Sequence, residues 1–159
     1  MGGITRTLIL SFLVGTVWVG GLPLLCAAPA ADGRFRVRTT TIDPDQGVNW
    51  EEAQLRYKGQ DYPFVLQAQT NTAPDVLMSL TGEHIDLDGL VYHLQHLSDF
   101  AGTYTRIAPE VASATWGADS GAVFQNGQGV VVLVIKGPRS ESLYLSLLGD
   151  SFQVLLSGF

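Results

Sequence analysis

The sequence is poor in cysteine and in basic residues. One cysteine, Cys26, occurs in 159 residues, and 9 lysines and arginines stand against 15 aspartates and glutamates. A single cysteine forms no disulfide within the chain and supplies no paired-thiolate zinc site. The formal net charge of −6 repels phosphate backbones, so the composition predicts that the protein does not bind nucleic acid.

The N-terminal segment, residues 1–30, is predicted to be an export signal that forms a helix. Arg6 is its only charged residue, and an apolar run from Leu8 to Leu25 follows. Small residues then close the segment at Ala28-Pro29-Ala30, the kind of pattern that signal peptidases cleave. We therefore expect cleavage near Ala30 and a protein that works in the periplasm or outside the cell.

Two alternatives for this segment stay open. The apolar run could remain as a membrane anchor, because it is barely long enough to span a bilayer, although its glycines and Pro23 weaken it as a helix. Lipid could instead be attached to Cys26, although Leu25 stands where lipidation requires a small residue. If the signal is cleaved, residues 31–159 form a single cysteine-free domain, more acidic by one charge and without stable membrane insertion.

Apolar and polar side chains alternate every second residue through most of the remaining chain, which predicts an all-β domain. Residues 51–57 and 62–69 are expected to form a hairpin around residues 58–61, with further short strands at 76–80 and 102–107. No stretch shows a convincing helical period, so we expect little helix. The fold class is therefore a mostly antiparallel sandwich or small barrel.

The last third of the chain has the clearest pattern. Asn126-Gly127 lies between two apolar segments and is typical of a hairpin turn. Residues 130–135 are apolar on both faces, which predicts a central strand. Two further strands, at 142–148 and 151–156, would complete a four-stranded meander.

Three arginines share one face of the first predicted strand. Arg34, Arg36 and Arg38 alternate with Phe35 and Val37. The three guanidinium groups could bind an anion. We favour the alternative that they form the solvent-facing side of an edge strand, where their charge discourages pairing with another chain.

The three histidines lie close together in the middle of the chain. His84, Asp86 and Asp88 would share one face of an extended chain, a trio that could bind a hard or borderline cation. His93 and His96 have the spacing of a helical metal pair, but the residues around them predict a strand, on which they would face opposite ways. Because neither cluster is a recognised ligand pattern, we expect ordinary surface residues and no metal site.

Residues 118–122, Ala-Asp-Ser-Gly-Ala, resemble the serine motif of trypsin-like proteases, but both outer glycines are alanine here. A domain of this length cannot build the two barrels that hold such a catalytic triad. No phosphate-cradling glycine loop and no convergent pair of carboxylates stand out. We predict no enzymatic activity, no catalytic residue and no cofactor.

Residues 89–104 resemble a pattern found in small exported bacterial proteins of unknown function. Those proteins carry Tyr-Lys-Gly…Tyr-Pro-Phe followed by Val-Tyr-x-Leu-x-x-Leu-x-Asp-Phe-x-Gly-Thr-Tyr, and residues 57–59 and 62–64 match the first part. The resemblance covers about residues 55–156 and implies export and a β fold, but no activity and no site residues. The end of the chain is also similar to the final strands of the SYLF lipid-binding domains, without their dense glycine motifs.

Together these features predict a non-enzymatic exported β domain that binds a partner or is associated with the cell envelope. The alternative is a carrier whose interior holds a lipid or another apolar molecule. An unfilled apolar interior would favour the carrier, whereas a filled interior with an exposed apolar patch would favour the partner-binding protein. A metal-dependent hydrolase would require His84 and Asp86 to converge with His93 or His96.

Overall fold

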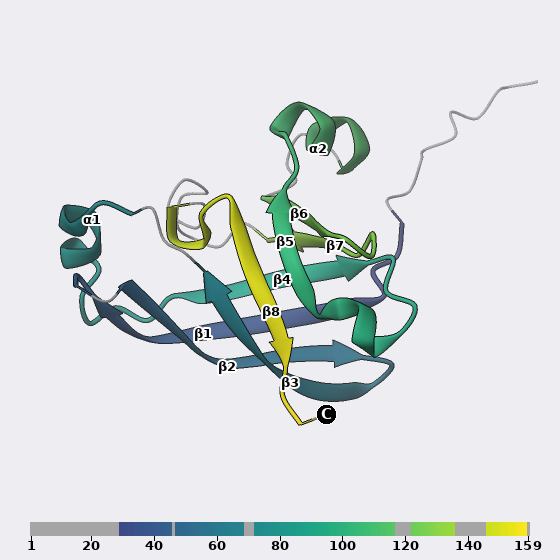
Figure 1. The fold of residues 1–159 in the computed structure, drawn as a ribbon, viewed down its shortest axis with the longest axis horizontal. Helices are drawn as coiled ribbons and strands as arrows, with labels where there is room; N and C mark the ends of the chain where they lie inside the picture. Colours follow the sequence, from purple (N-terminus) through teal and green to yellow (C-terminus); the bar gives the residue numbers. More distant parts are fainter. Residues whose placement is uncertain (1–28, 46, 69–71, 117–121, 136–145, 159) are drawn as a thin grey trace, which may run out of the picture.

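The computed structural model describes residues 29–45, 47–68, 72–116, 122–135 and 146–158. These residues form a closed barrel of antiparallel strands (Figure 1). The strands are β1 (Gly33–Asp43), β2 (Gly47–Tyr57), β3 (Gln60–Ala68), β4 (Asp86–Tyr92), β5 (Gly102–Arg106), β6 (Val123–Asn126), β7 (Val131–Val134) and β8 (Ser151–Leu156). Their order around the barrel is β1-β2-β3-β8-β5-β6-β7-β4, and β4 pairs with β1 to close the ring.

The all-β prediction is confirmed, and the barrel is the architecture that forms. The hairpin predicted around residues 58–61 is β2–β3, and Asn126-Gly127 begins the turn between β6 and β7. The four-stranded meander is not confirmed, because β8 lies between β3 and β5 and pairs with both. Residues 146–148 are helical, so the strand expected over 142–148 is wrong there. The rest of that strand, like the signal segment up to residue 28, lies outside the described residues.

Short helices occur where the sequence pattern predicted strand or loop. The helix α1 (Pro74–Ser79) replaces the strand expected over 76–80. Pro74 stands in its first turn, where a missing N–H costs nothing, and Asp75 complements the positive end of the helix. The helix α2 (Pro109–Trp116) begins in the same way, with proline followed by an acid. Both helices are too short for a helical period to stand out.

Aromatic side chains fill the barrel interior. Six rings form a continuous chain through it: Phe35, Phe64, Phe100, Tyr104, Phe152 and Phe124. Neighbouring ring centroids lie between 4.9 and 6.4 Å apart, mostly in edge-on or stacked arrangements that favour aromatic pairs. Tyr104 and Phe124 are completely buried. The alternation that predicted strands therefore also places the large rings on one side of the sheet, where they meet.

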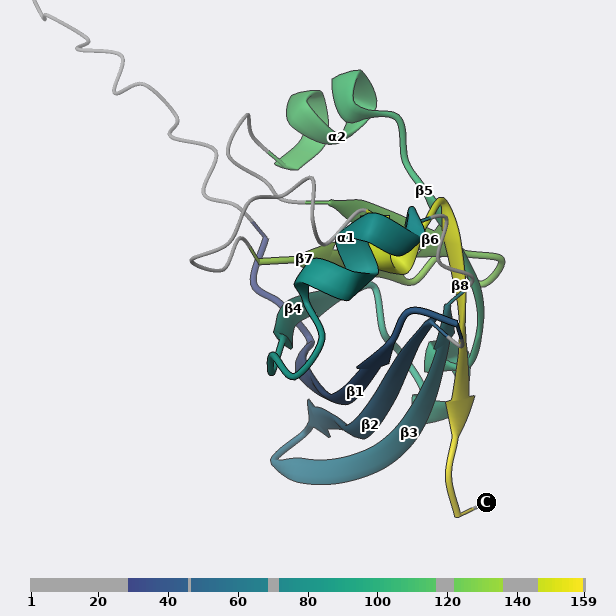
Figure 2. The same cartoon turned by 90° about the vertical axis from the view of Figure 1, so that its left-hand side faces the viewer.

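Buried side chains close both ends of the barrel. At one end α1 and its C-cap residue contribute Leu77 and Leu80 to the core, and α1 lies across this end in Figure 2. At the other end the 3-10 helix η1 (Leu97–Phe100) contributes Phe100. The Tyr104 hydroxyl donates a hydrogen bond of 2.8 Å to the Phe100 carbonyl and fixes η1 to β5.

The helix α2 covers part of the outer wall and forms a second apolar cluster there. Its residue Ala112 and the last residue, Trp116, pack near Tyr92 on β4 and Val131 on β7. The ring centroids of Tyr92 and Trp116 are 4.4 Å apart. This cover explains why residues 131–134 are apolar on both faces: one face points into the barrel and the other lies under α2.

Candidate functional site

The outer wall of the barrel has three parts, because side chains alternate between the interior and the outside along each strand. The helix α2 covers the first part, over β4, β6 and β7. The second part, on β1, β2 and the starts of β3 and β4, is strongly charged, and the third, on the second half of β3 and on β8, β5 and part of β6, carries no charge. The two parts that α2 leaves uncovered are the candidate sites.

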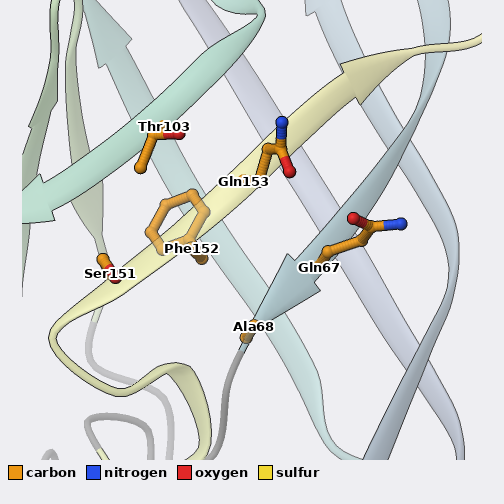
Figure 3. Close-up of a pocket in the computed structure, with 6 residues that line it drawn as sticks. All are labelled: Gln67, Ala68, Thr103, Ser151, Phe152 and Gln153. Atoms are coloured by element: carbon orange, nitrogen blue, oxygen red, sulfur yellow. The ribbon is translucent and has the colours of Figure 1, made fainter.

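We call the third part the uncharged wall. It consists of the exposed outward residues of the second half of β3 and of β8, β5 and β6, namely Val65, Gln67, Thr103, Thr105, Gln125, Ser151, Gln153 and Leu155. Strand register arranges them in rows across the barrel. Val65 lies opposite Leu155, and Gln153 lies between Gln67 on β3 and Thr103 on β5 (Figure 3).

The row of Gln67, Gln153 and Thr103 lines a shallow depression of about 300 Å³. No described residue hydrogen-bonds to these three side chains. In the next row, Val65 and Leu155 are 41% and 40% exposed. Apolar contacts beside neutral hydrogen-bonding groups, with charge excluded, are typical of the centre of a protein–protein interface.

We call the charged part the arginine wall. It consists of the outward residues Arg34, Arg36, Arg38, Gln54, Arg56, Asp86 and Asp88. The ion pairs that the described residues form here are Arg36–Asp88 at 2.9 Å, Arg38–Glu52 at 3.3 Å, Arg38–Asp86 at 3.6 Å and Arg56–Asp61 at 3.3 Å. The hydrogen bond with Asp88 raises the pKa of Arg36 further above its ordinary value.

The strand β1 is not an edge strand, because β2 pairs with one side of it and β4 with the other. The interpretation of Arg34, Arg36 and Arg38 as protection of an exposed edge is therefore wrong, since closure of the barrel leaves this strand no free edge. The prediction that the three arginines share one face agrees with the structure, in which Phe35 and Val37 are buried between them.

The residues considered as metal ligands do not converge. Asp86 and Asp88 share the outer face of β4, but each contacts an arginine of β1. Nδ1 of His84 lies 3.3 Å from the carbonyl oxygen of Thr39. The first trio therefore has separate partners.

The other two histidines lie beyond the end of β4 and outside any α-helix. His93 has a left-handed backbone, with φ of 61°, and its ring centroid is 6.1 Å from that of Trp116. His96 precedes η1, where its Nδ1 lies 3.4 Å from Oδ2 of Asp99. Within the described ranges, no three His, Cys, Asp or Glu side chains are placed to hold a metal ion. The serine motif falls on residues 118–121, outside those ranges, and on buried Ala122.

Comparisons of the chain with protein-family models, with curated proteins and with solved structures give no match. Among the described residues, no helix has the length and apolar character needed to cross a membrane.

Sequence reasoning did not find the uncharged wall as a unit. Alternation alone places Val65 with Gln67, and Gln153 with Leu155, on common faces of their own strands. Nothing in the local pattern indicates that β8 lies between β3 and β5. The signal that could have been used is the absence of charge at the outward positions of β5, β8 and the second half of β3, in a chain rich in acids.

Proposed function

We propose that the protein is a non-enzymatic exported β-barrel that binds a partner protein through the uncharged wall. One observation carries this proposal: the exposed apolar pair Val65 and Leu155 lies beside a row of neutral hydrogen-bonding side chains that have no partner among the described residues. Isolated exposed apolar residues are common, but two in register beside such a row form a coherent patch.

The packed interior supports partner binding over transport of a ligand. The chain of aromatic rings runs across the barrel, and the core side chains around it are almost completely buried. Among the described residues, outward side chains line one depression on the uncharged wall and two on the arginine wall, all outside the barrel. Binding is therefore expected on the outer surface.

The cellular location of the protein is also part of the proposal. The apolar run from Leu8 to Leu25 and the small residues near Ala30 favour export to the periplasm or beyond, with a role at the cell envelope. An uncleaved anchor or lipidation at Cys26 would tether the same barrel to a membrane. Nucleic acid is not an expected partner, because the chain is acidic.

A carrier for lipid or another apolar molecule is the second candidate, and one observation favours it. The indole N–H of Trp50 is buried inside the barrel, and no described residue accepts a hydrogen bond from it. An unpaired buried donor costs about 1–3 kcal/mol. A carboxyl or carbonyl oxygen of a bound apolar molecule would satisfy it. In a Trp116→Phe background of the mature domain, oleic acid should shift the fluorescence of Trp50 if the carrier function is correct.

Site-specific photo-crosslinking in the cells that make the protein tests the partner-binding proposal. A photoreactive residue at Gln153 is expected to give a covalent adduct with a defined partner protein. The matched control is Gln128, which is also exposed but lies in the β6–β7 turn and is not part of the uncharged wall. A Leu155→Lys substitution should abolish the adduct at Gln153, because a buried unpaired charge disrupts an interface.

The result that contradicts partner binding is an absence of adducts at Gln153, or equal adducts at Gln153 and Gln128. Native mass spectrometry of the purified protein then separates the two candidate functions. A retained second chain supports the partner, whereas a retained lipid together with a Trp50 response supports the carrier.

A further inference from the structure

The arginine wall contains one cation that its neighbours do not neutralise. Arg36 and Arg56 have carboxylate partners, and Arg38 has two. Arg34 forms no ion pair with any described residue. The second acid beside Arg38 balances the charge of the wall as a whole, so the excess cation is confined to the end of β1 at Arg34.

The strand register places a second arginine next to Arg34. Arg34 on β1 lies directly opposite Arg56 on β2, and the residues next to them in sequence, Phe35 and Leu55, are buried. Both guanidinium groups therefore start from the same side of the sheet. Like charges directly opposite each other destabilise a strand pair. Because β1 is paired on both sides, edge protection does not explain why the arrangement is present.

A depression of about 270 Å³ lies at this position. Its polar lining consists of Arg34, Arg36, Arg56 and Gln54, together with Asp61 and Asp88. The two acids match two of the three arginines, so one positive charge remains. The side-chain amide of Gln54 has no hydrogen-bond partner among the described residues and adds a neutral donor.

We infer that Arg34 and Arg56, supported by Arg36 and Gln54, form a binding site for an oxyanion group of the phosphate or sulfate type. The planar guanidinium group donates two parallel hydrogen bonds to such a group, and charge-assisted bonds of this kind are stronger than neutral ones. A bound oxyanion also removes the repulsion between the two facing arginines. The site is on a different wall from the proposed protein interface and does not depend on it.

Titration of the mature domain with inorganic phosphate, followed by NMR of the arginine Nε–Hε groups, tests the inference. At physiological ionic strength we expect saturable shifts at Arg34 and Arg56. The Arg34→Gln variant should bind about tenfold more weakly or worse, which corresponds to the loss of one charge-assisted contact. Arg56→Gln should show a similar loss.

Arg38→Gln is the matched control, because it removes the same charge from the same face of β1 but lies outside the depression. Its affinity should stay within about twofold of the unsubstituted protein, since exposed, already paired charges contribute little. Equal weakening by Arg34→Gln and Arg38→Gln would overturn the inference, because it would indicate a diffuse field and no site.

Vesicles of phosphatidylglycerol distinguish the source of the oxyanion. A response to phosphate assigns the site to a soluble ligand. Binding to vesicles that is lost in Arg34→Gln, without a response to free phosphate, assigns it to a lipid headgroup. No Arg34-dependent response to either probe would refute the site. Circular dichroism of each variant confirms folding, which is expected because Arg34 is exposed and makes no ion pair with described residues.

Discussion

Gly89 on β4 and Phe35 on β1 face each other so closely that no side chain fits at residue 89. The two are register partners, and a Cβ atom added to Gly89 would lie 1.9 Å from Cε1 of Phe35. Phe35 in turn packs edge-on against Phe64, with ring centroids 6.4 Å apart. The missing side chain at Gly89 therefore makes room for the first ring of the aromatic chain.

Replacement of Gly89 by alanine is expected to destabilise the barrel. The added methyl group overlaps the Phe35 ring, which must shift within a packed core, and overpacking of this kind costs about 1–3 kcal/mol. Urea unfolding of the mature domain, monitored by circular dichroism, measures the loss.

Two further variants isolate the cause. Gly127→Ala is the control, because a Cβ at Gly127 meets nothing within 4 Å, and a change of less than about 0.5 kcal/mol is expected there. In a Phe35→Leu background, Gly89→Ala should cost less than in the unsubstituted protein, since the two residues are in contact. Equal costs in both backgrounds would show that the ring is not the obstacle.

The local parts of the fold could be predicted from the sequence, and the closure of the barrel could not. Alternation and turn residues identify β2–β3 and β6–β7, whose partners are adjacent in sequence. The strand β8 instead pairs with β3 and β5, and both of these strands are far from β8 in the sequence. The alternation of apolar and polar residues in β8 is the same whichever strands flank it, so the sequence pattern alone favours the simpler meander. The helix α1 was missed because Val76 and Leu80 suit a strand equally well.

The uncharged wall and the pairing of Arg36 with Asp88 depend on that closure, whereas the Arg34–Arg56 pair depends on the register between β1 and β2. Sequence alternation correctly placed Arg34, Arg36 and Arg38 on one face, but it could not show that Arg56 lies opposite Arg34 or that acids pair with the other arginines. Likewise, Gln67 and Gln153 become neighbours only because β8 pairs with β3. The charge of each side chain is known from the sequence. Whether a side chain of opposite charge lies next to it depends on the order of the strands in the barrel.

Asn126 is expected to be critical for the end of the barrel near η1. Its side-chain amide donates to the Asp99 carbonyl at 2.7 Å, and its Oδ1 accepts from the backbone N–H groups of Gln128 and Val130, both at 3.0 Å. Asn126→Ala should cost about 2–4 kcal/mol, because it leaves several largely buried backbone groups unpaired. The exposed neighbour Gln125 is the control, and Gln125→Ala should unfold at nearly the same urea concentration as the unsubstituted protein.

Arg34→Gln is expected to stabilise the protein by about 0.2–1 kcal/mol when no anion is bound, because it removes a charge directly opposite Arg56. The gain should shrink at high ionic strength, which screens exposed charges. Arg36→Gln serves as the comparison, since it breaks the 2.9 Å bond with Asp88 and should bring no gain. Thermal unfolding in low-salt, phosphate-free buffer measures both variants, and a loss of stability in Arg34→Gln would contradict the predicted repulsion.

Tyr104 is expected to make stability fall at alkaline pH. Its side chain is completely buried, and burial raises the pKa of Tyr104 above its ordinary value of 10.0. The folded state thus holds the phenolic proton at pH values where the unfolded chain releases it. The contribution of Tyr104 to stability is therefore complete below pH 10.0 and falls as the pH rises above that value.

The Tyr104→Phe variant tests this sign. At neutral pH it should be less stable by roughly 1–3 kcal/mol, because the Phe100 carbonyl loses its hydrogen bond. Above pH 10.0 the difference from the unsubstituted protein should narrow, since phenylalanine has no proton to lose. Phe35→Leu, which removes a core ring that is not in ring contact with Tyr104 and changes no titrating group, should keep a constant difference over the same range. If the Tyr104→Phe difference were equally constant, ionisation of this buried phenol would not limit alkaline stability.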